Sequence, residues 1–249
     1  MLAPFNMKKI IFLGSKPIGY ACLQYLIAQQ KKLNFEIIGV LTNDNTQFNP
    51  KQSVKALAEK NKIKLIPSLA KMPACDILYS VQYHEILQSQ HIQQAKQIAV
   101  NLHMAPLPDY RGCNQFSFAI IDKAKTFGTT IHQLETGIDN GAILFEDRFK
   151  IQKNSWVKDL YEETEKRSIA LFESNLKNIV EGNYQPKAQS SFQRKSSFHL
   201  RKEINHIKKI DLNWSKKKIE RHIRATYFPP FEPPYTELAG VKIYFSSTF

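Results

Sequence analysis

The feature that most constrains the fold of this chain is the alternation of short apolar runs with helix-length segments through its first half. Apolar runs of strand length lie at residues 8–14, 35–41, 63–66, 76–81 and 97–103. Helix-length segments lie between them, at residues 18–30, at residues 54–61 and from about His84 onward. Strands separated by such helices predict βαβ units, which assemble into a parallel sheet with right-handed crossovers. The chain is therefore expected to be an α/β protein with a Rossmann-like, mostly parallel sheet and helices on both faces.

The second half predicts two late strands, a long helix and a smaller region behind them. Extended runs at residues 128–134 and 142–151 are expected to join the sheet, and residues 156–180 form an amphipathic helix. The composition then turns polar and basic, which divides the chain into a first domain (1–183) and a small α+β region (184–249). In that region we expect a short helix at 221–226, an aromatic, proline-rich turn at 227–235 and one strand at 241–245.

Charge is unevenly distributed along the chain. The sequence has 35 Lys and Arg against 22 Asp and Glu, for a net charge of +13. Residues 187–224 hold twelve of the basic residues and only three acidic ones, so most of the excess lies there. Such a segment attracts partners that carry phosphate, whether nucleic acid, a membrane surface or a small phosphorylated molecule. The alternative is a solvated, lysine-rich surface without a specific partner.

Composition excludes several other classes. With 43% hydrophobic residues the chain can bury a sizeable core, unlike a disordered polycation. No apolar run approaches the roughly 20 residues that span a bilayer, and residues 1–13 lack a signal-peptide pattern. Cys22, Cys75 and Cys113 are widely spaced, which suggests neither a disulfide framework nor a zinc site. We therefore expect a cytoplasmic protein that does not bind membranes. Met7 could be the natural first residue, in which case Met1–Asn6 would precede the native chain.

The turn after the first strand bears on cofactor use. It reads Gly14-Ser15-Lys16-Pro17-Ile18-Gly19, with a lysine where the second glycine of a dinucleotide fingerprint would stand. This disfavours a nicotinamide or flavin enzyme. Lys16 lies at the carboxyl end of a strand, where α/β proteins bind ligands, so we expect it to meet a phosphate of the substrate. The alternative is a surface lysine at the start of a helix.

Three polar residues are expected to meet at the same edge of the sheet. Asn101 and His103 lie two apart at the end of the apolar strand 97–103, so their side chains project to the same side. Residues 104–112 follow as a proline-stiffened loop that ends in Tyr-Arg-Gly. Asp139 lies farther along, in a short loop between Gly137 and Gly141.

The combination of Asn-x-His, Pro-Leu-Pro-x-Tyr-Arg-Gly and an Asp between glycines resembles the formyltransferases that use N10-formyltetrahydrofolate. The resemblance covers residues 7–180, departing at Met104-Ala105-Pro106, where the family more often has Pro-Ser-Leu. It implies a catalytic triad of Asn101, His103 and Asp139, with N10-formyltetrahydrofolate as cosubstrate and no metal.

The chemistry of amine formylation suits these three side chains. Asn101 offers an amide donor to the oxygen that gains negative charge. His103 titrates near neutral pH and is expected to take the amine proton as general base, while Asp139 orients its ring and stabilises its cationic form. His132, on the neighbouring extended run, is expected to be structural.

The C-terminal region discriminates among members of this family. The methionyl-tRNA enzymes carry a complete OB-type barrel there, whereas one strand is expected after Pro234 in this chain. Residues 211–231 instead resemble the tail of the nucleotide-sugar N-formyltransferases, which supports dimerisation. We therefore expect a homodimer that formylates a nucleotide-linked 4-amino-4,6-dideoxysugar for O-antigen-type polysaccharide. The first choice is dTDP-4-amino-4,6-dideoxyglucose, which would give dTDP-4-formamido-4,6-dideoxyglucose.

Other substrates and other classes stay open. GDP-perosamine is the nearest rival sugar. The basic segment leaves open a methionyl-tRNA formyltransferase-like enzyme that acts on tRNA, although we do not expect nucleic-acid binding. A non-catalytic nucleotide-binding module is disfavoured because Asn101, His103 and Asp139 are all present.

The remaining expected contacts lie around the same edge. Substrate is expected to contact Lys16 together with Tyr83, Arg111 and Asn114, and Arg111 has the alternative role of supporting a loop. The folate is expected along the loop from Gln133 to Asn140, with contacts from Gln133, Leu134, Gly137 and Ile138.

Overall fold

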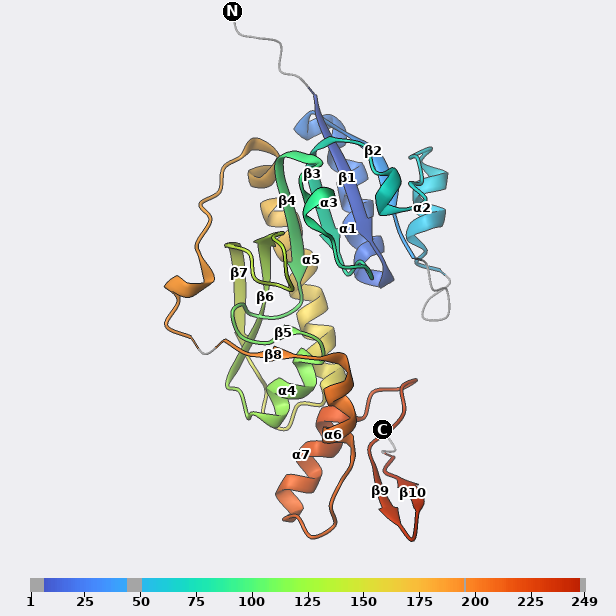
Figure 1. The fold of residues 1–249 in the computed structure, drawn as a ribbon, viewed down its shortest axis with the longest axis vertical. Helices are drawn as coiled ribbons and strands as arrows, with labels where there is room; N and C mark the ends of the chain where they lie inside the picture. The colour runs from blue at the N-terminus through green and yellow to red at the C-terminus, as the bar shows by residue number, and fades with distance from the viewer. Residues whose placement is uncertain (1–6, 44–50, 195, 247–249) are drawn as a thin grey trace, which may run out of the picture.

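A six-stranded mixed sheet forms the body of the protein (Figure 1). The computed structural model describes residues 7–43, 51–194 and 196–246, so the prediction about Met1–Asn6 lies outside the described residues. The strand order is β2 (Phe35–Leu41), β1 (Lys8–Gly14), β3 (Cys75–Val81), β4 (Ala95–His103), β6 (Thr126–Gln133) and β7 (Ile143–Lys150). The first four strands run parallel, while β6 and β7 are antiparallel to their neighbours. The predicted Rossmann-like fold is confirmed.

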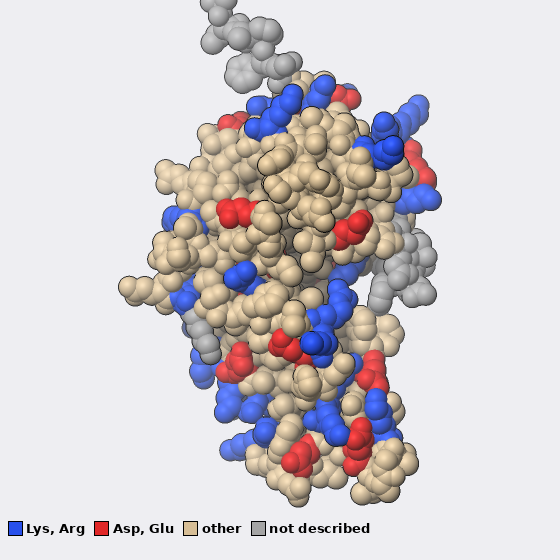
Figure 2. Space-filling model, viewed as in Figure 1, with Lys and Arg blue, Asp and Glu red and all other residues tan. Residues whose placement is uncertain are grey.

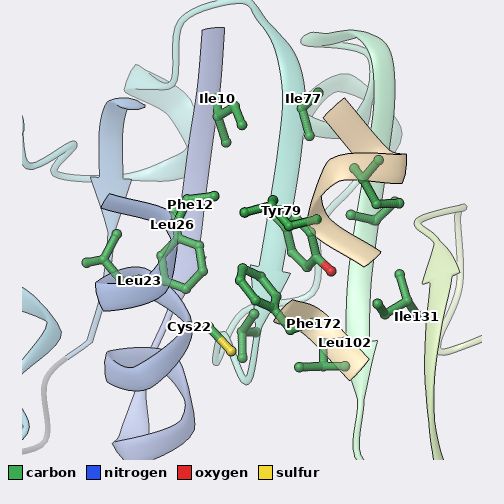
Figure 3. Close-up of a cluster of buried hydrophobic side chains, with 14 of the residues drawn as sticks. Ile10, Phe12, Cys22, Leu23, Leu26, Ile77, Tyr79, Leu102, Ile131 and Phe172 are labelled. Atoms are coloured by element: carbon green, nitrogen blue, oxygen red, sulfur yellow. The ribbon is translucent and has the colours of Figure 1, made fainter. Parts of the chain in front are cut away.

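Two long helices, α1 (Lys16–Leu33) and α5 (Val157–Glu181), cover one face of the sheet. Pro17 stands in the first turn of α1, where a missing N–H is tolerated, and Cys22 and Leu26 follow at helical spacing on its buried side. Figure 3 shows these side chains meeting Phe12 from β1 and Phe172 from α5. Burying each large apolar side chain stabilises the fold by about 1.5–3 kcal/mol.

The opposite face is covered by shorter pieces. They are a 3-10 turn, η1 (Leu69–Lys71), and a single helical turn, α3 (Ser89–Ile92), while α2 (Val54–Lys60) packs on α1. A helix was predicted from about His84, but residues 82–88 are irregular and only the single turn of α3 follows them. Within that segment Leu87 is buried in the core, whereas its neighbour Ile86 is exposed.

The predicted strand at residues 63–66 is also wrong. The segment makes only an isolated bridge, in which Val40 N–H donates to the Lys64 carbonyl and Ile66 N–H donates to the Val40 carbonyl, both at 2.9 Å. Pro67 comes next and has no N–H with which to continue a ladder. The sheet therefore ends at β2.

Beyond α5 the chain returns along the edge strand β7 before it builds the C-terminal region (Figure 1). This returning segment, residues 185–194 and 196–200, is called the strap below. It includes η2 (Gln189–Ser191) and ends in β8 (Phe198–His199), which pairs with β5 (Arg111–Gly112) just before α4 (Gln115–Ile121). The division at residues 183 and 184 stays a prediction.

The C-terminal region contains η3 (Arg201–Glu203), α6 (Ile204–Lys208) and α7 (Lys216–Thr226), followed by the strands β9 (Tyr235–Leu238) and β10 (Val241–Tyr244). The predicted helix at 221–226 begins earlier, at Lys216. Its first turn was missed because three consecutive lysines there hide the amphipathic pattern. The predicted single strand is one arm of a hairpin. Its other arm was missed because Ala239 and Gly240 take positive φ angles and make a tight turn that a Gly alone signals weakly. No helix in the described ranges is long and apolar enough to cross a membrane.

Candidate functional site

Asn101, His103 and Asp139 meet at the carboxyl end of β4. Asn101 and His103 are on the strand itself, and Asp139 comes from the loop that joins β6 to β7. His103 Nδ1 lies 3.6 Å from Asp139 Oδ2, and the His103 side chain is buried. The sequence therefore placed these three side chains together correctly, and the antiparallel pairing of β4 with β6 is what brings the Asp139 loop back to the end of β4.

His132 lies in the same cluster. It pairs directly with Asn101 in the β4–β6 ladder, and its Nε2 is 3.2 Å from Asn101 Nδ2 and 3.6 Å from Asp139 Oδ1. Its Nδ1 lies 2.7 Å from the Gln133 carbonyl, which only accepts, so Nδ1 carries a hydrogen. In the neutral ring Nε2 therefore accepts from the Asn101 amide. The expectation of a purely structural His132 missed this contact, because only the antiparallel register reveals it.

The same reasoning locates the proton on His103. Its Nε2 lies 3.2 Å from the carbonyl oxygen of Tyr110, so Nε2–H donates to that oxygen. In the neutral ring the lone pair is then on Nδ1, the nitrogen that faces Asp139. His103 is thus held with its basic nitrogen beside a carboxylate, an arrangement suited to accepting a proton and stabilising the resulting cation.

The ionisation of the pair follows from its surroundings. Burial lowers the pKa of His103 below 6.5, and Asp139 offsets only part of that shift. Burial opposes ionisation of Asp139, yet the rings of His103 and His132 and the N–H of Gly112 hold the pKa of its carboxyl well below the usual range. Near neutral pH the site therefore contains a neutral imidazole next to a carboxylate, which is the state that a general base needs.

The loop that carries Asp139 is held tightly by its neighbours. Asp139 has a φ of 50°, and Gly141 approaches the Gln133 carbonyl so closely that a Cβ would meet that oxygen at 2.0 Å. Arg111 donates through Nε and Nη2 to the Ile138 carbonyl at 3.1 and 2.9 Å. Position 141 therefore requires glycine, because its backbone lies too close to the Gln133 carbonyl for any side chain.

Two of the predicted substrate contacts are engaged within the protein. The Arg111 guanidinium supports the Ile138 carbonyl, which is the alternative role that the sequence left open. Asn114 Nδ2 donates to the carbonyls of Leu200 and Arg201 at 3.0 and 3.1 Å, so it ties the strap to the start of α4. Direct contact of either residue with substrate stays a prediction.

The other two predicted contacts border the same edge of the sheet. Lys16 Nζ donates to Gln82 Oε1 at 2.9 Å, and Tyr83 Oη donates to Glu85 Oε1 at 2.9 Å. Desolvation of the Lys16 ammonium by its neighbours, and then the charge of Arg201, lower the pKa of Lys16 although part of its side chain reaches solvent. Figure 2 shows Lys and Arg side chains grouped where the lower ends of the central strands meet the C-terminal region. The edge of the sheet is thus positively charged beside the buried carboxylate.

The expected folate contacts border the Asp139 loop. Gln133 ends β6 and Leu134 follows it, while Gly137 has a φ of 117° and its missing Cβ leaves room for the Asn140 amide. Asn140 Oδ1 is buried and has no hydrogen-bond partner among the described residues. This loop therefore holds a polar acceptor that the described protein does not satisfy. Nowhere in the part of the chain that the structure describes do three or more His, Cys, Asp or Glu side chains form a group that could hold a metal ion.

A family comparison decides what kind of protein carries this cluster. Residues 8–175 match the formyl transferase family model, which is well over half of the chain. The chain belongs to the formyl transferase family. The matched range includes all four residues of the cluster formed by Asn101, His103, His132 and Asp139. It confirms the resemblance drawn from the Asn-x-His and Tyr-Arg-Gly motifs.

Individual relatives in the family differ in what they act on. The chain is 28% identical to the GDP-perosamine N-formyltransferase of Brucella melitensis biotype 1 over 170 residues, which cover 68% of this chain and 63% of that protein. It is 28% identical to the methionyl-tRNA formyltransferase of Pediococcus pentosaceus over 251 residues, covering 95% of this chain and 76% of that enzyme.

Structural similarity to the family extends over the C-terminal region. WlaRD, a sugar 3N-formyl transferase whose crystal structure was determined in the presence of dTDP and 5-N-formyl-THF, superposes with a TM-score of 0.77 at 25% identity. The superposition covers 95% of this chain and 85% of WlaRD. The formyl transferase fold is thus shared along almost the whole chain.

Proposed function

We propose that this protein transfers a formyl group from N10-formyltetrahydrofolate to the amino group of a nucleotide-linked 4-amino-4,6-dideoxysugar. The preferred acceptor is dTDP-4-amino-4,6-dideoxyglucose. The observation that carries the proposal is the buried pair of His103 Nδ1 and Asp139 Oδ2, 3.6 Å apart, beside the Asn101 amide. Relatives that formylate sugars support the acceptor class, and the dTDP present in the WlaRD crystal supports the choice of nucleotide.

The reaction joins the sugar nitrogen to the formyl carbon and breaks the bond from that carbon to N10 of the folate. The attacking amine must lose a proton, and the departing nitrogen must gain one. His103 Nδ1 is the group that accepts the first proton, because Nε2–H is already held by the Tyr110 carbonyl. Asp139 then stabilises the imidazolium, and the proton is passed on to the leaving nitrogen. General base catalysis of this kind contributes about 10²–10⁴ in rate.

Asn101 stabilises the negative charge that develops on the formyl oxygen. One hydrogen of its amide is directed to His132 Nε2 at 3.2 Å, which fixes the amide plane. The second hydrogen is then free to donate to the substrate oxygen. Removing one such donor typically lowers the rate by about 10²–10³.

The residues of the Asp139 loop fit a folate. Asn140 Oδ1 is a buried acceptor without a partner in the described chain, and the pterin ring of a folate carries N–H donors. Gln133, Leu134, Gly137 and Ile138 surround the same loop and would contact the ring. When bound, the cosubstrate supplies the activated formyl group.

The basic residues around Lys16 suit the diphosphate of a nucleotide sugar. Burial, and then the charge of Arg201, lower the pKa of Lys16, so an anion bound beside both side chains would relieve their repulsion. Tyr83 and Asn114 lie on the strand ends and helix start that border this position. A diphosphate at Lys16 would hold the nucleotide sugar at the edge of the sheet that also carries the His103–Asp139 pair.

A homodimer is part of the same proposal. The hairpin of β9 and β10 exposes apolar side chains, including Leu238 (65% exposed) and Val241 (63% exposed), and in the described residues β10 pairs with β9 alone. A second copy seated on this hairpin would cover these side chains and the open edge of β10.

The two rival substrates are separated by one assay. Purified protein is incubated with N10-formyltetrahydrofolate and, separately, with dTDP- and GDP-linked 4-amino-4,6-dideoxysugars and with methionyl-tRNA. The proposal expects the fastest formylation with the dTDP-linked sugar. Faster formylation of GDP-perosamine would change the nucleotide, and formylation of the tRNA alone would replace the proposed function.

A further inference from the structure

The strap reaches across the molecule to the functional site. Lys187 exchanges two backbone hydrogen bonds with Ile143 at the start of β7, both at 2.9 Å. Farther on, Arg194 binds both carboxylate oxygens of Glu146 and donates to the Leu107 carbonyl at 3.1 Å. Figure 1 shows this orange segment running beside β7 down to β8. The strap is therefore anchored on both sides of η2.

Gln189, at the start of η2, lies between these anchors and binds the Asp139 loop. Its Nε2 donates to the carbonyl of Asp139 at 2.7 Å and to the carbonyl of Gly141 at 2.9 Å. One side-chain amide thus uses both hydrogens on the backbone on either side of Asn140. No other side chain in the described residues makes two such bonds to the carbonyl groups that flank Asn140.

These two bonds act on a backbone that needs support. Asp139 has a φ of 50°, a left-handed conformation that is unfavourable for an L-residue by roughly 1–2 kcal/mol. Its carboxylate must nevertheless stay within reach of His103 Nδ1 and of the Gly112 N–H. Fixing the carbonyl of the same residue through Gln189 Nε2 limits rotation of the whole peptide unit. Placement of the carboxylate then depends on the strap.

We propose that Gln189 is a positioning residue for the formyl transfer, which clamps the Asp139 loop so that the carboxylate faces His103. The expected effect of Gln189 on kcat rests on the proposed function, because it needs the formyl transfer to be measured. Both hydrogen bonds of Gln189 Nε2 go to backbone carbonyls of the Asp139 loop, so we expect it to act through the placement of that loop. The strap thereby becomes part of the active site, although it begins beyond the helix that ends the family match.

The test compares Gln189→Met, Gln189→Ala and Gln193→Ala. Methionine keeps the length and packing of Gln189 but donates no hydrogen bond, and Gln193 is an exposed residue of the same strap. Both Gln189 variants should lower kcat by about 10- to 100-fold with little change in KM for the nucleotide sugar, because displacement of a catalytic group by about 1 Å costs up to 10²-fold. Gln193→Ala should retain wild-type kcat and KM. Thermal unfolding of all three verifies that the fold is kept.

A second measurement requires no substrate. In protein labelled with ¹⁵N-histidine, NMR titration follows the His103 ring, which is faced by Asp139 from its loop, His132 from β6 and Arg111 from β5. Displacing the carboxylate should lower the pKa of His103 further in Gln189→Met, because a nearby negative charge favours the cationic ring.

The outcomes separate the two proposals. Gln189→Met with wild-type kcat and an unshifted His103 pKa would overturn the positioning role, as would rescue of the Ala defect by Met, which would indicate packing alone. If wild-type protein formylates no amine offered, the proposed function fails, and the NMR titration decides the role of Gln189 by itself.

Discussion

The amide of Asn101 lies 3.2 Å from Nε2 of His132, directly across the antiparallel pair β4–β6. This contact fixes the orientation of the amide, because the Nδ1–H of His132 is held by the Gln133 carbonyl at 2.7 Å. A side chain that stabilises a developing charge must be held in place before the reaction begins. The pair therefore connects the geometry of the sheet to the chemistry of the site.

Substitution of either member of this pair should have different effects. Asn101→Ala removes the donor and should lower kcat by about 10²–10³. His132→Phe keeps a ring but removes the acceptor that orients the amide, so kcat should fall by only about tenfold, the equivalent of one ordinary hydrogen bond. Steady-state kinetics of the two variants measure both numbers. A larger loss from His132→Phe than from Asn101→Ala would contradict the assigned roles.

Asp139→Asn should lower kcat and also change its pH dependence. Asp139 raises the pKa of His103 against the effect of burial, so its removal lowers that pKa further. The neutral ring is the active base, and the acidic limb of kcat/KM should therefore move to lower pH while kcat at pH 7.5 falls by at least about 10²-fold. The pH profile of the variant is the measurement. An acidic limb that moves to higher pH would be incompatible with this electrostatic account.

The stability of the protein should decrease as the pH falls below 6.5. Burial lowers the folded-state pKa of His103, so the unfolded chain binds more protons between that lowered value and 6.5. The free energy of unfolding therefore keeps the full contribution of neutral His103 above pH 6.5. It loses this contribution as the pH falls from 6.5 to the lowered pKa of the folded state. Urea denaturation at several pH values, for wild type and for His103→Gln, isolates it as the difference. Identical pH slopes in the two proteins would show that His103 does not contribute.

Tyr79→Phe should leave stability unchanged or raise it slightly. Tyr79 is fully buried against Phe172, with ring centroids 4.7 Å apart, and its hydroxyl has no hydrogen-bond partner within the described ranges (Figure 3). Leaving a buried hydroxyl unsatisfied costs about 1–3 kcal/mol, which phenylalanine avoids without loss of packing. Denaturant unfolding measures the difference. Destabilisation by more than about 1 kcal/mol would reveal a partner for the hydroxyl.

Val241→Asp should convert the proposed dimer to a monomer. Val241 pairs with Leu238 on the exposed hairpin, and a carboxylate there would be desolvated if a second copy covered it. Light scattering after size exclusion gives the mass of the wild type and of the variant. Thr126→Ser, on the distant strand β6, is the matched control. A monomeric wild type would refute the proposed use of the hairpin.

Much of the sheet could be predicted because its strands are short apolar runs with strong local patterns. Asn101 and His103 were placed correctly since strand alternation puts residues two apart on one side. The failures have local physical causes as well. Residues 63–66 are apolar enough for a strand, but Pro67 ends their pairing, and residues 82–88 are held by the core instead of by helical hydrogen bonds.

Parts of the site could not be predicted because they depend on long-range register. His132 joins the cluster only through the antiparallel pairing of β6 with β4, and nothing in its own neighbourhood indicates that pairing. Gln189 reaches the Asp139 loop only after α5 has crossed the sheet and the strap has returned along β7. Arg111 was expected at the site, yet only the structure shows its guanidinium on the Ile138 carbonyl.

The central claim is that His103, oriented by Asp139, deprotonates an amine on a nucleotide-linked sugar. The most direct measurement is a single-turnover assay with N10-formyltetrahydrofolate and dTDP-4-amino-4,6-dideoxyglucose, followed by mass spectrometry of the sugar product, for wild type and His103→Ala. We predict a formamido sugar from the wild type and a rate lowered by about 10²–10⁴ in the variant. Equal rates in the two proteins, or no formylated sugar from the wild type with either the dTDP- or the GDP-linked acceptor, would contradict it.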